Sequence, residues 1–162
     1  GHVVEVINGL SKAHVYRALS EKAKNGVAIT KMWCMPDEYN LVDESMGRKY
    51  CSIDNAKTTI QRMMALQSVT EECGLDDMAP RMWTEMVVAE IPEKGYVLQR
   101  RGLMQDIAPG VSLLSLTDWA KPEVVLDIVS RINSTQVVRG AIYDLLFSMC
   151  DRHLGNVFVD ES

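Results

Sequence analysis

The first third of the chain consists of short β-rich runs separated by turn residues. The runs cover residues 3–7, 14–19 and 27–33, and the dipeptides Asn8-Gly9 and Asn25-Gly26 are strong turn signals. In the second and third runs, apolar and polar residues alternate as they do in a strand with two different faces. We therefore predict three strands that form a meander.

The middle of the chain mixes strand and helix patterns. Residues 36–49 are polar and acidic and predict a solvated loop or insertion. Apolar residues at Ala56, Ile60 and Met63 have helical spacing, which predicts a helix that begins near Ser52 or Asp54 and ends near Gly74. Two further strands are predicted over residues 83–90 and 95–100, with some extended chain at 104–107.

The last third has the 3.6-residue period of helices. Pro122 predicts the first turn of one helix, and a second is predicted from about Thr135. A short strand is predicted over residues 156–160. A β-rich half is thus followed by an α-rich half, which predicts an α+β fold. The apolar residues of the second helix that we expect to face inward are Val137, Val138, Ala141, Ile142, Leu145, Leu146 and Met149.

Composition and charge exclude some classes of protein. The 162 residues predict a single domain, and 17 basic against 22 acidic side chains give a net charge of −5, which disfavours nucleic acid as a partner. The four cysteines lack the paired spacing of a zinc site, so a reducing compartment, the cytoplasm, is favoured. No apolar run is long enough for a transmembrane segment, and the first residues lack the basic and apolar regions of a signal peptide. The chain begins with Gly1, and we expect it to be part of a larger polypeptide or complex.

The densest group of chemically active side chains is Asp151-Arg152-His153-Leu154-Gly155-Asn156, between the second helix and the last strand. On residue types alone, Arg152 could pair with a surface acid, His153 could lie in the interior and Asn156 could cap a turn. A hydrolase or thiol site is disfavoured, because adjacent residues of one loop rarely converge on one reacting atom.

This Asp-Arg-His-x-x-Asn segment resembles the catalytic loop of the atypical kinases, above all the phosphoinositide 3-/4-kinase family, with related loops in HipA-type and secretory-pathway kinases. The resemblance implies a protein-kinase-like two-lobed fold and an ATP- and magnesium-dependent phosphotransferase that acts on a hydroxyl of a lipid or protein. Residues 1–107 would form the small lobe. Residues 108–162 would form the hinge and a large lobe truncated just after the catalytic loop.

The resemblance also implies roles for single residues. Asp151 would orient or deprotonate the attacking hydroxyl, His153 would assist the proton transfer or hold the loop, and Asn156 would bind magnesium. Lys31, on the third strand, would reach the ATP phosphates. Ser11 and Lys12 lie where a phosphate-covering loop is expected.

Two further expectations follow from the same resemblance. The helix after the third strand should carry a carboxylate that pairs with Lys31, and Asp54 is the first choice, with Glu71 or Glu72 the second. Residues 104–110 should form the interlobe hinge, in which Gln105 and Ile107 would contact adenine.

One departure from the family leaves a second function open. The aspartate that follows the catalytic loop in kinases is absent from this chain, which ends at Ser162, so these residues alone are not expected to complete the reaction. The alternative is a pseudokinase or scaffold subunit that binds protein partners. The ten methionines could serve a partner surface, but their spacing favours core positions.

Overall fold

The computed structural model describes residues 1–7, 14–33, 42–43, 48–49, 53–91, 95–147 and 154–160. The chain divides into two compact units. The first contains residues 1–69 and 80–107, and the second contains residues 70–79 and 108–162. Each unit is described by itself.

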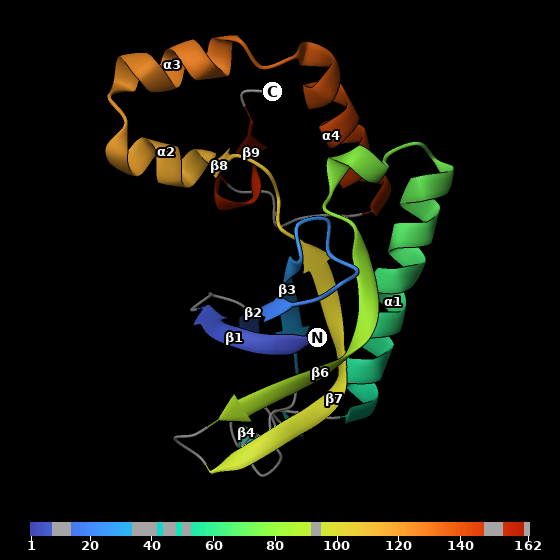
Figure 1. Ribbon diagram of the computed structural model, residues 1–162. Coiled ribbons are helices and arrows are strands. Elements are labelled where there is room, and N and C mark those ends of the chain that lie inside the picture. Colours follow the sequence, from blue (N-terminus) through green and yellow to red (C-terminus); the bar gives the residue numbers. More distant parts are fainter. Residues whose placement is uncertain are drawn as a thin grey trace. The chain divides into compact units, whose positions relative to one another are not determined.

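The first unit contains a closed barrel of five strands in the order β1-β2-β3-β7-β6 (Figure 1). Neighbouring strands are antiparallel, except that β1 and β6 are parallel. The predicted meander of the first three strands is confirmed, and the two later predicted strands are present but longer than expected. The strands are β1 (His2–Ile7), β2 (His14–Leu19), β3 (Val27–Met32), β6 (Met82–Ile91) and β7 (Tyr96–Asp106).

Closure of this barrel shows that the prediction of a two-lobed kinase fold was wrong. The barrel closes where His2 of β1 pairs with Val88 of β6, and the Val88 N–H donates a hydrogen bond of 3.0 Å to the Gly1 carbonyl. Closure leaves no open edge at that position, and a closed sheet followed by helices is not a kinase small lobe. The first three residues of the predicted interlobe hinge belong to the barrel, because Met104 to Asp106 pair with β3.

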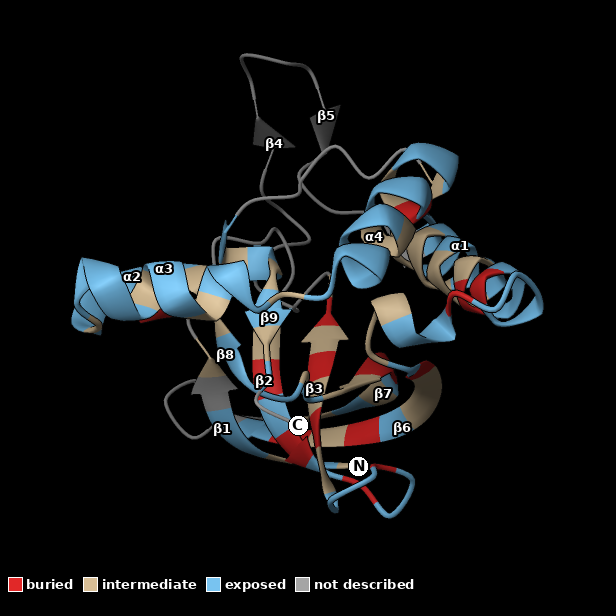
Figure 2. Cartoon of the chain, turned by 90° about the horizontal axis from the view of Figure 1, so that it is seen from above, coloured by how far each residue is buried: buried red, intermediate tan, exposed pale blue. Residues whose placement is uncertain are grey.

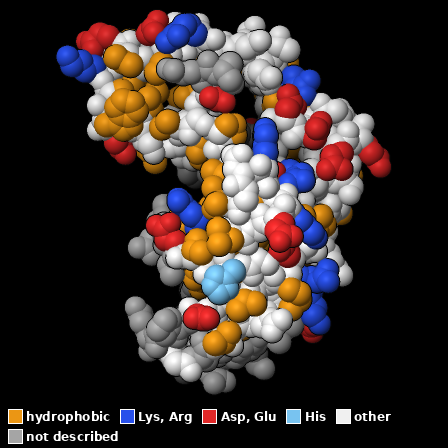
Figure 3. All heavy atoms as spheres, in the orientation of Figure 1, with side chains coloured by type: hydrophobic (Ala, Val, Ile, Leu, Met, Phe, Trp, Pro, Cys, Tyr) orange, Lys and Arg blue, Asp and Glu red, His pale blue; other side chains and the backbone are white. Residues whose placement is uncertain are grey.

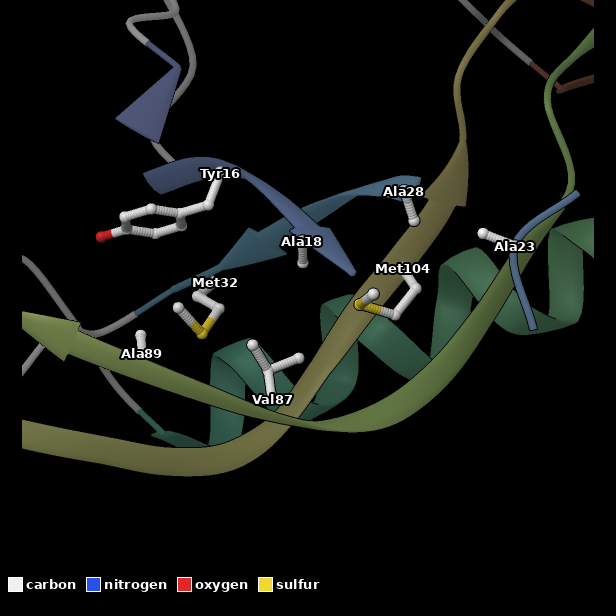
Figure 4. Close-up of a cluster of buried hydrophobic side chains, with 8 residues drawn as sticks. All are labelled: Tyr16, Ala18, Ala23, Ala28, Met32, Val87, Ala89 and Met104. Atoms are coloured by element: carbon white, nitrogen blue, oxygen red, sulfur yellow. The ribbon is translucent and has the colours of Figure 1, made fainter. Parts of the chain in front are cut away.

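Small side chains inside the barrel explain why the sheet can curve so tightly. Alanines at 18, 28 and 89 are at most 1% exposed, and they share the interior with Met32, Val87 and Met104 (Figure 4). Gly102 also faces this core, since a Cβ placed there would lie 2.9 Å from both the Thr30 Oγ1 and the Val87 Cγ2. A narrow barrel needs such a mixture of small and large residues to fill its interior without voids.

Helix α1 (Ile53–Glu72) runs beside the outer surface of the barrel, as Figures 1 and 4 both show. It begins and ends within a few residues of its predicted bounds. Buried Gln67 fixes the helix to the sheet, because its Oε1 accepts a 3.1 Å hydrogen bond from the Met82 N–H. Within the predicted loop 36–49, strands β4 (Val42–Asp43) and β5 (Arg48–Lys49) form a short pair.

The second unit is mainly helical. Its strands β8 and β9 pair with each other. Gly110, just before β8, has a φ of +78°, and a Cβ there would lie 1.9 Å from the Val159 carbonyl oxygen, so only glycine fits. The elements are η2 (Asp76–Met78), β8 (Val111–Ser112), α2 (Leu113–Trp119), α3 (Pro122–Ser130), α4 (Ser134–Phe147), η4 (Leu154–Asn156) and β9 (Phe158–Val159).

The inward face predicted for the helix after Thr135 is wrong for most of its residues. Tyr143 is the residue of α4 that is buried, whereas Leu145 is 82% exposed. Figure 2 shows most of α3 and α4 as exposed, and Figure 3 shows hydrophobic side chains gathered over α2 and α3. Met149 lies outside the described residues. Val137, Val138, Ile142 and Leu146 are also exposed.

No helix in the described part of the chain is both long enough and apolar enough to span a membrane.

Candidate functional site: a basic groove beside helix α1

The first unit contains a groove of about 670 Å³ between helix α1 and the outer surface of the barrel. The alternation of β3 determines which of its side chains face the groove. Ala28, Thr30 and Met32 of β3 are buried, so the strand's alternation places Lys31 on the opposite face from them. The groove is lined by Lys31, Met32, Trp33, Ala56, Lys57, Ile60, Gln61, Met64, Thr84, Arg100 and Arg101.

The helix side of the groove comes from one face of α1. Ala56, Ile60 and Met64 are spaced by four residues, so they lie in one row along the helix, and Lys57 and Gln61 lie next to that row. The apolar row and the two polar side chains beside it all line the groove. The pattern that predicted an ordinary amphipathic helix therefore also builds one wall of a site.

The charge of the groove is positive. Four of its lining residues are basic, and none of the eleven is acidic. The Arg101 Nη1 donates a 3.2 Å hydrogen bond to the Thr84 hydroxyl, which holds the guanidinium over neighbouring strand β6. Such a groove attracts an anion.

Burial lowers the pKa of the Lys31 amine from its usual value of 10.5, because desolvation disfavours the charged form. Among the described residues, no carboxylate forms an ion pair with Lys31. A bound anion would supply an opposite charge that the described residues do not place beside Lys31.

Comparison with known proteins leaves the family open. No protein-family model, no curated protein and no solved structure matches this chain. The kinase resemblance thus rests on the residues of the chain itself, and the activity that it implies remains a prediction.

The structure places the residues predicted to bind ATP in different surroundings. Lys31 lines the groove. Gln105 lies in the middle of the sheet, paired with Ile29 on one side and Met82 on the other, and it does not line the groove. Ile107 follows β7 and is 48% exposed. The predicted phosphate-covering residues Ser11 and Lys12 lie outside the described residues.

Asp54, the predicted partner of Lys31, is exposed in the first turn of α1 and does not line the groove. Glu71 and Glu72, the second choice, are exposed at the other end of the helix. The helix face that borders the groove carries Lys57 and Gln61 instead of a carboxylate. This arrangement adds positive charge where the kinase resemblance implied a neutralising acid.

Of the residues predicted to be catalytic, Asp151 and His153 lie outside the described residues. Asn156 is exposed in η4, directly before β9. The structure therefore describes one of the three, and it lies in the second unit, whereas Lys31 lies in the first.

Ten of the eleven described lining residues were not predicted as site residues, among them Trp33, Lys57, Arg100 and Arg101. The signal for Lys57 was its place beside the Ala56, Ile60 and Met64 row. The signal for Arg100 and Arg101 was a pair of adjacent cations in a predicted strand. Neither signal could be used without knowing that β7 lies beside β3.

Proposed function

We propose that the groove around Lys31 binds the phosphates of ATP, and that the chain takes part in ATP- and magnesium-dependent transfer of the γ-phosphate to a hydroxyl of a lipid or protein. The observation that carries this proposal is the set of four basic residues in a groove that has no acid among its described lining residues. Proteins bind phosphate groups with lysine and arginine side chains in this way.

The groove suits a nucleotide in shape as well as in charge. Its volume of about 670 Å³ lies within the range usual for small-molecule sites. Trp33, Ile60 and Met64 offer an apolar surface for a planar base, and Lys31, Lys57 and Arg101 offer cations for the phosphates. A ligand with one flat apolar end and one anionic end would use both parts.

The chemistry of transfer is assigned by the catalytic-loop resemblance. Asp151 would accept the proton of the acceptor hydroxyl, whose oxygen forms a bond to the γ-phosphorus while the bond to the β–γ bridging oxygen breaks and ADP leaves. His153 would assist that proton transfer or hold the loop.

Magnesium would neutralise phosphate charge during transfer, and Asn156 would offer it one amide oxygen. Within the described residues, no three histidine, cysteine or carboxylate side chains come together as a metal site. The described residues therefore do not by themselves form a magnesium site.

The test is phosphate transfer from ATP labelled at the γ-position, with lipid vesicles and protein mixtures as acceptors and the full-length protein as enzyme. We expect labelled product with the wild type and none with Asp151→Asn. Absence of labelling with every acceptor, or equal labelling by Asp151→Asn, would refute the proposed transfer reaction.

A second candidate function, a scaffold that binds protein partners, is favoured by the second unit. Trp119 and Leu126 are each 69% exposed there, and further apolar side chains of α3 and α4 are exposed with them. Exposed apolar groups of this extent are typical of interaction surfaces. A chain that binds partners and has no measurable affinity for ATP would support this function over phosphotransfer.

A further inference from the structure

The described lining of the Lys31 groove offers cations, which can neutralise phosphate charge as a metal ion does. Lys31 and Arg101 come from the barrel and Lys57 comes from α1, so positive charge borders the groove from both sides. Among the described lining residues none is a carboxylate, and carboxylates are the ligands with which proteins usually hold magnesium against a nucleotide. The described lining therefore offers cations to phosphate oxygens and no carboxylate to a metal ion.

We propose that this groove binds its nucleotide as the metal-free polyphosphate, with Lys31, Lys57 and Arg101 neutralising the phosphates, and that magnesium weakens binding there. The inference rests on the ATP-binding part of the proposed function, and not on its magnesium-dependent transfer step, and it adds the form of the ligand. Magnesium removes roughly two of the roughly four negative charges that ATP carries at neutral pH. The magnesium complex is thus a weaker partner for a groove that supplies only cations.

The size of the effect follows from the strength of partly exposed ion pairs. One such pair changes an affinity by roughly 1.5-fold to 5-fold, so the loss of two charges should weaken binding by roughly 2-fold to 30-fold. The same reasoning predicts that affinity rises from AMP to ADP to ATP when no metal is present, because each added phosphate brings further charge into the groove.

The experiment is a calorimetric titration of ATP into the whole chain, first in EDTA and then in saturating magnesium, with sodium chloride used to match the ionic strength. We expect binding in EDTA and weaker binding in magnesium. Lys57→Gln should weaken the binding in EDTA by roughly 1.5-fold to 5-fold. Arg62→Gln, on the same helix but outside the groove, makes the same change in charge and should leave the affinity unchanged.

The outcomes separate this inference from the proposed function. If ATP binds more tightly in magnesium than in EDTA, metal-free binding is wrong and the nucleotide site stands. If inorganic tripolyphosphate binds in EDTA as tightly as ATP, the groove is a metal-free polyphosphate site and its role as a nucleotide site is wrong. If neither ligand binds, both are wrong.

Discussion

Gly102, in the middle of β7, offers a sharp test of the closed barrel. A Cβ at this position would lie 2.9 Å from the Thr30 Oγ1 and 2.9 Å from the Val87 Cγ2, and both of these residues are fully buried. Threonine and valine are branched at Cβ and rotate about χ1 only at a cost, so neither side chain can easily move away. We therefore expect Gly102→Ala to strain the interior.

The magnitude can be worked from these contacts. Overpacking of a well-filled core usually costs about 1–3 kcal/mol. The Thr30 hydroxyl also donates a 3.3 Å hydrogen bond to the Leu103 carbonyl, and a shift that breaks this bond adds about 1 kcal/mol. Exchange of glycine for alanine in a strand otherwise stabilises by about 0.5–1 kcal/mol. We expect Gly102→Ala to lower the free energy of unfolding of the first unit by about 1–3 kcal/mol.

The assay is urea unfolding followed by tryptophan fluorescence in a Trp119→Phe background. The other two of the three tryptophans, Trp33 and Trp83, lie in the first unit, so the signal then reports that unit alone. Gly140→Ala in α4 is the matched control, because a Cβ there has no neighbour within 4 Å. Followed by circular dichroism, Gly140→Ala should stabilise by about 0.5–1 kcal/mol.

A double variant tests the cause of the strain. Val87→Ala removes one of the two clashing atoms, so Gly102→Ala combined with Val87→Ala should cost at least about 0.5 kcal/mol less than the sum of the single variants. If Gly102→Ala is as stable as the wild type, or more stable, Gly102 does not face a filled interior and the description of the barrel is wrong.

Three other substitutions have defined expectations. Because burial lowers the pKa of the Lys31 amine, stability should rise with pH as that amine loses its proton below pH 10.5. Lys31→Met should abolish this rise and stabilise the protein at pH 7 in urea unfolding. Burial alone would raise the pKa of Glu85, but hydrogen bonds from the Ser20 hydroxyl (2.6 Å) and the Trp83 indole N–H (3.0 Å) lower it. Stability should therefore fall as the pH drops below about 4.5, and Glu85→Gln should flatten this fall in urea unfolding. Gly110→Ala should cost at least about 2 kcal/mol in thermal unfolding of the second unit, and unchanged stability would contradict the pairing of β8 with β9.

The local structure of this chain was largely predictable from the sequence, and the way its elements assemble was not. The strand runs and turn dipeptides located β1, β2 and β3, and helical spacing located α1, because these signals come from neighbouring residues. Closure depends on the pairing of His2 with Val88, which are far apart in the chain. The small interior residues Ala18 and Gly102 were a signal of tight curvature, but their meaning depends on knowing that they share one core.

In the candidate site, too, the local placement of a residue could be predicted from the sequence, and what surrounds that residue could not. Lys31 was predicted to bind ATP from its place on the third strand, and the structure puts it in the basic groove. Asp54, the expected partner of Lys31, does not line the groove, because the face of α1 beside the groove begins at Ala56 and carries Lys57. The apolar stripe of the last helix predicted burial, but its period shows only that one face is apolar and not what covers it.

The most direct test of the central claim is whether ATP binds at Lys31. Equilibrium dialysis with radiolabelled ATP would compare the wild type with Lys31→Met, and with Lys24→Met, which changes an exposed lysine outside the groove. We expect saturable binding of ATP by the wild type and by Lys24→Met, and at least about a tenfold loss of affinity for ATP in Lys31→Met. Equal affinity in all three proteins, or no binding to the wild type, would contradict it.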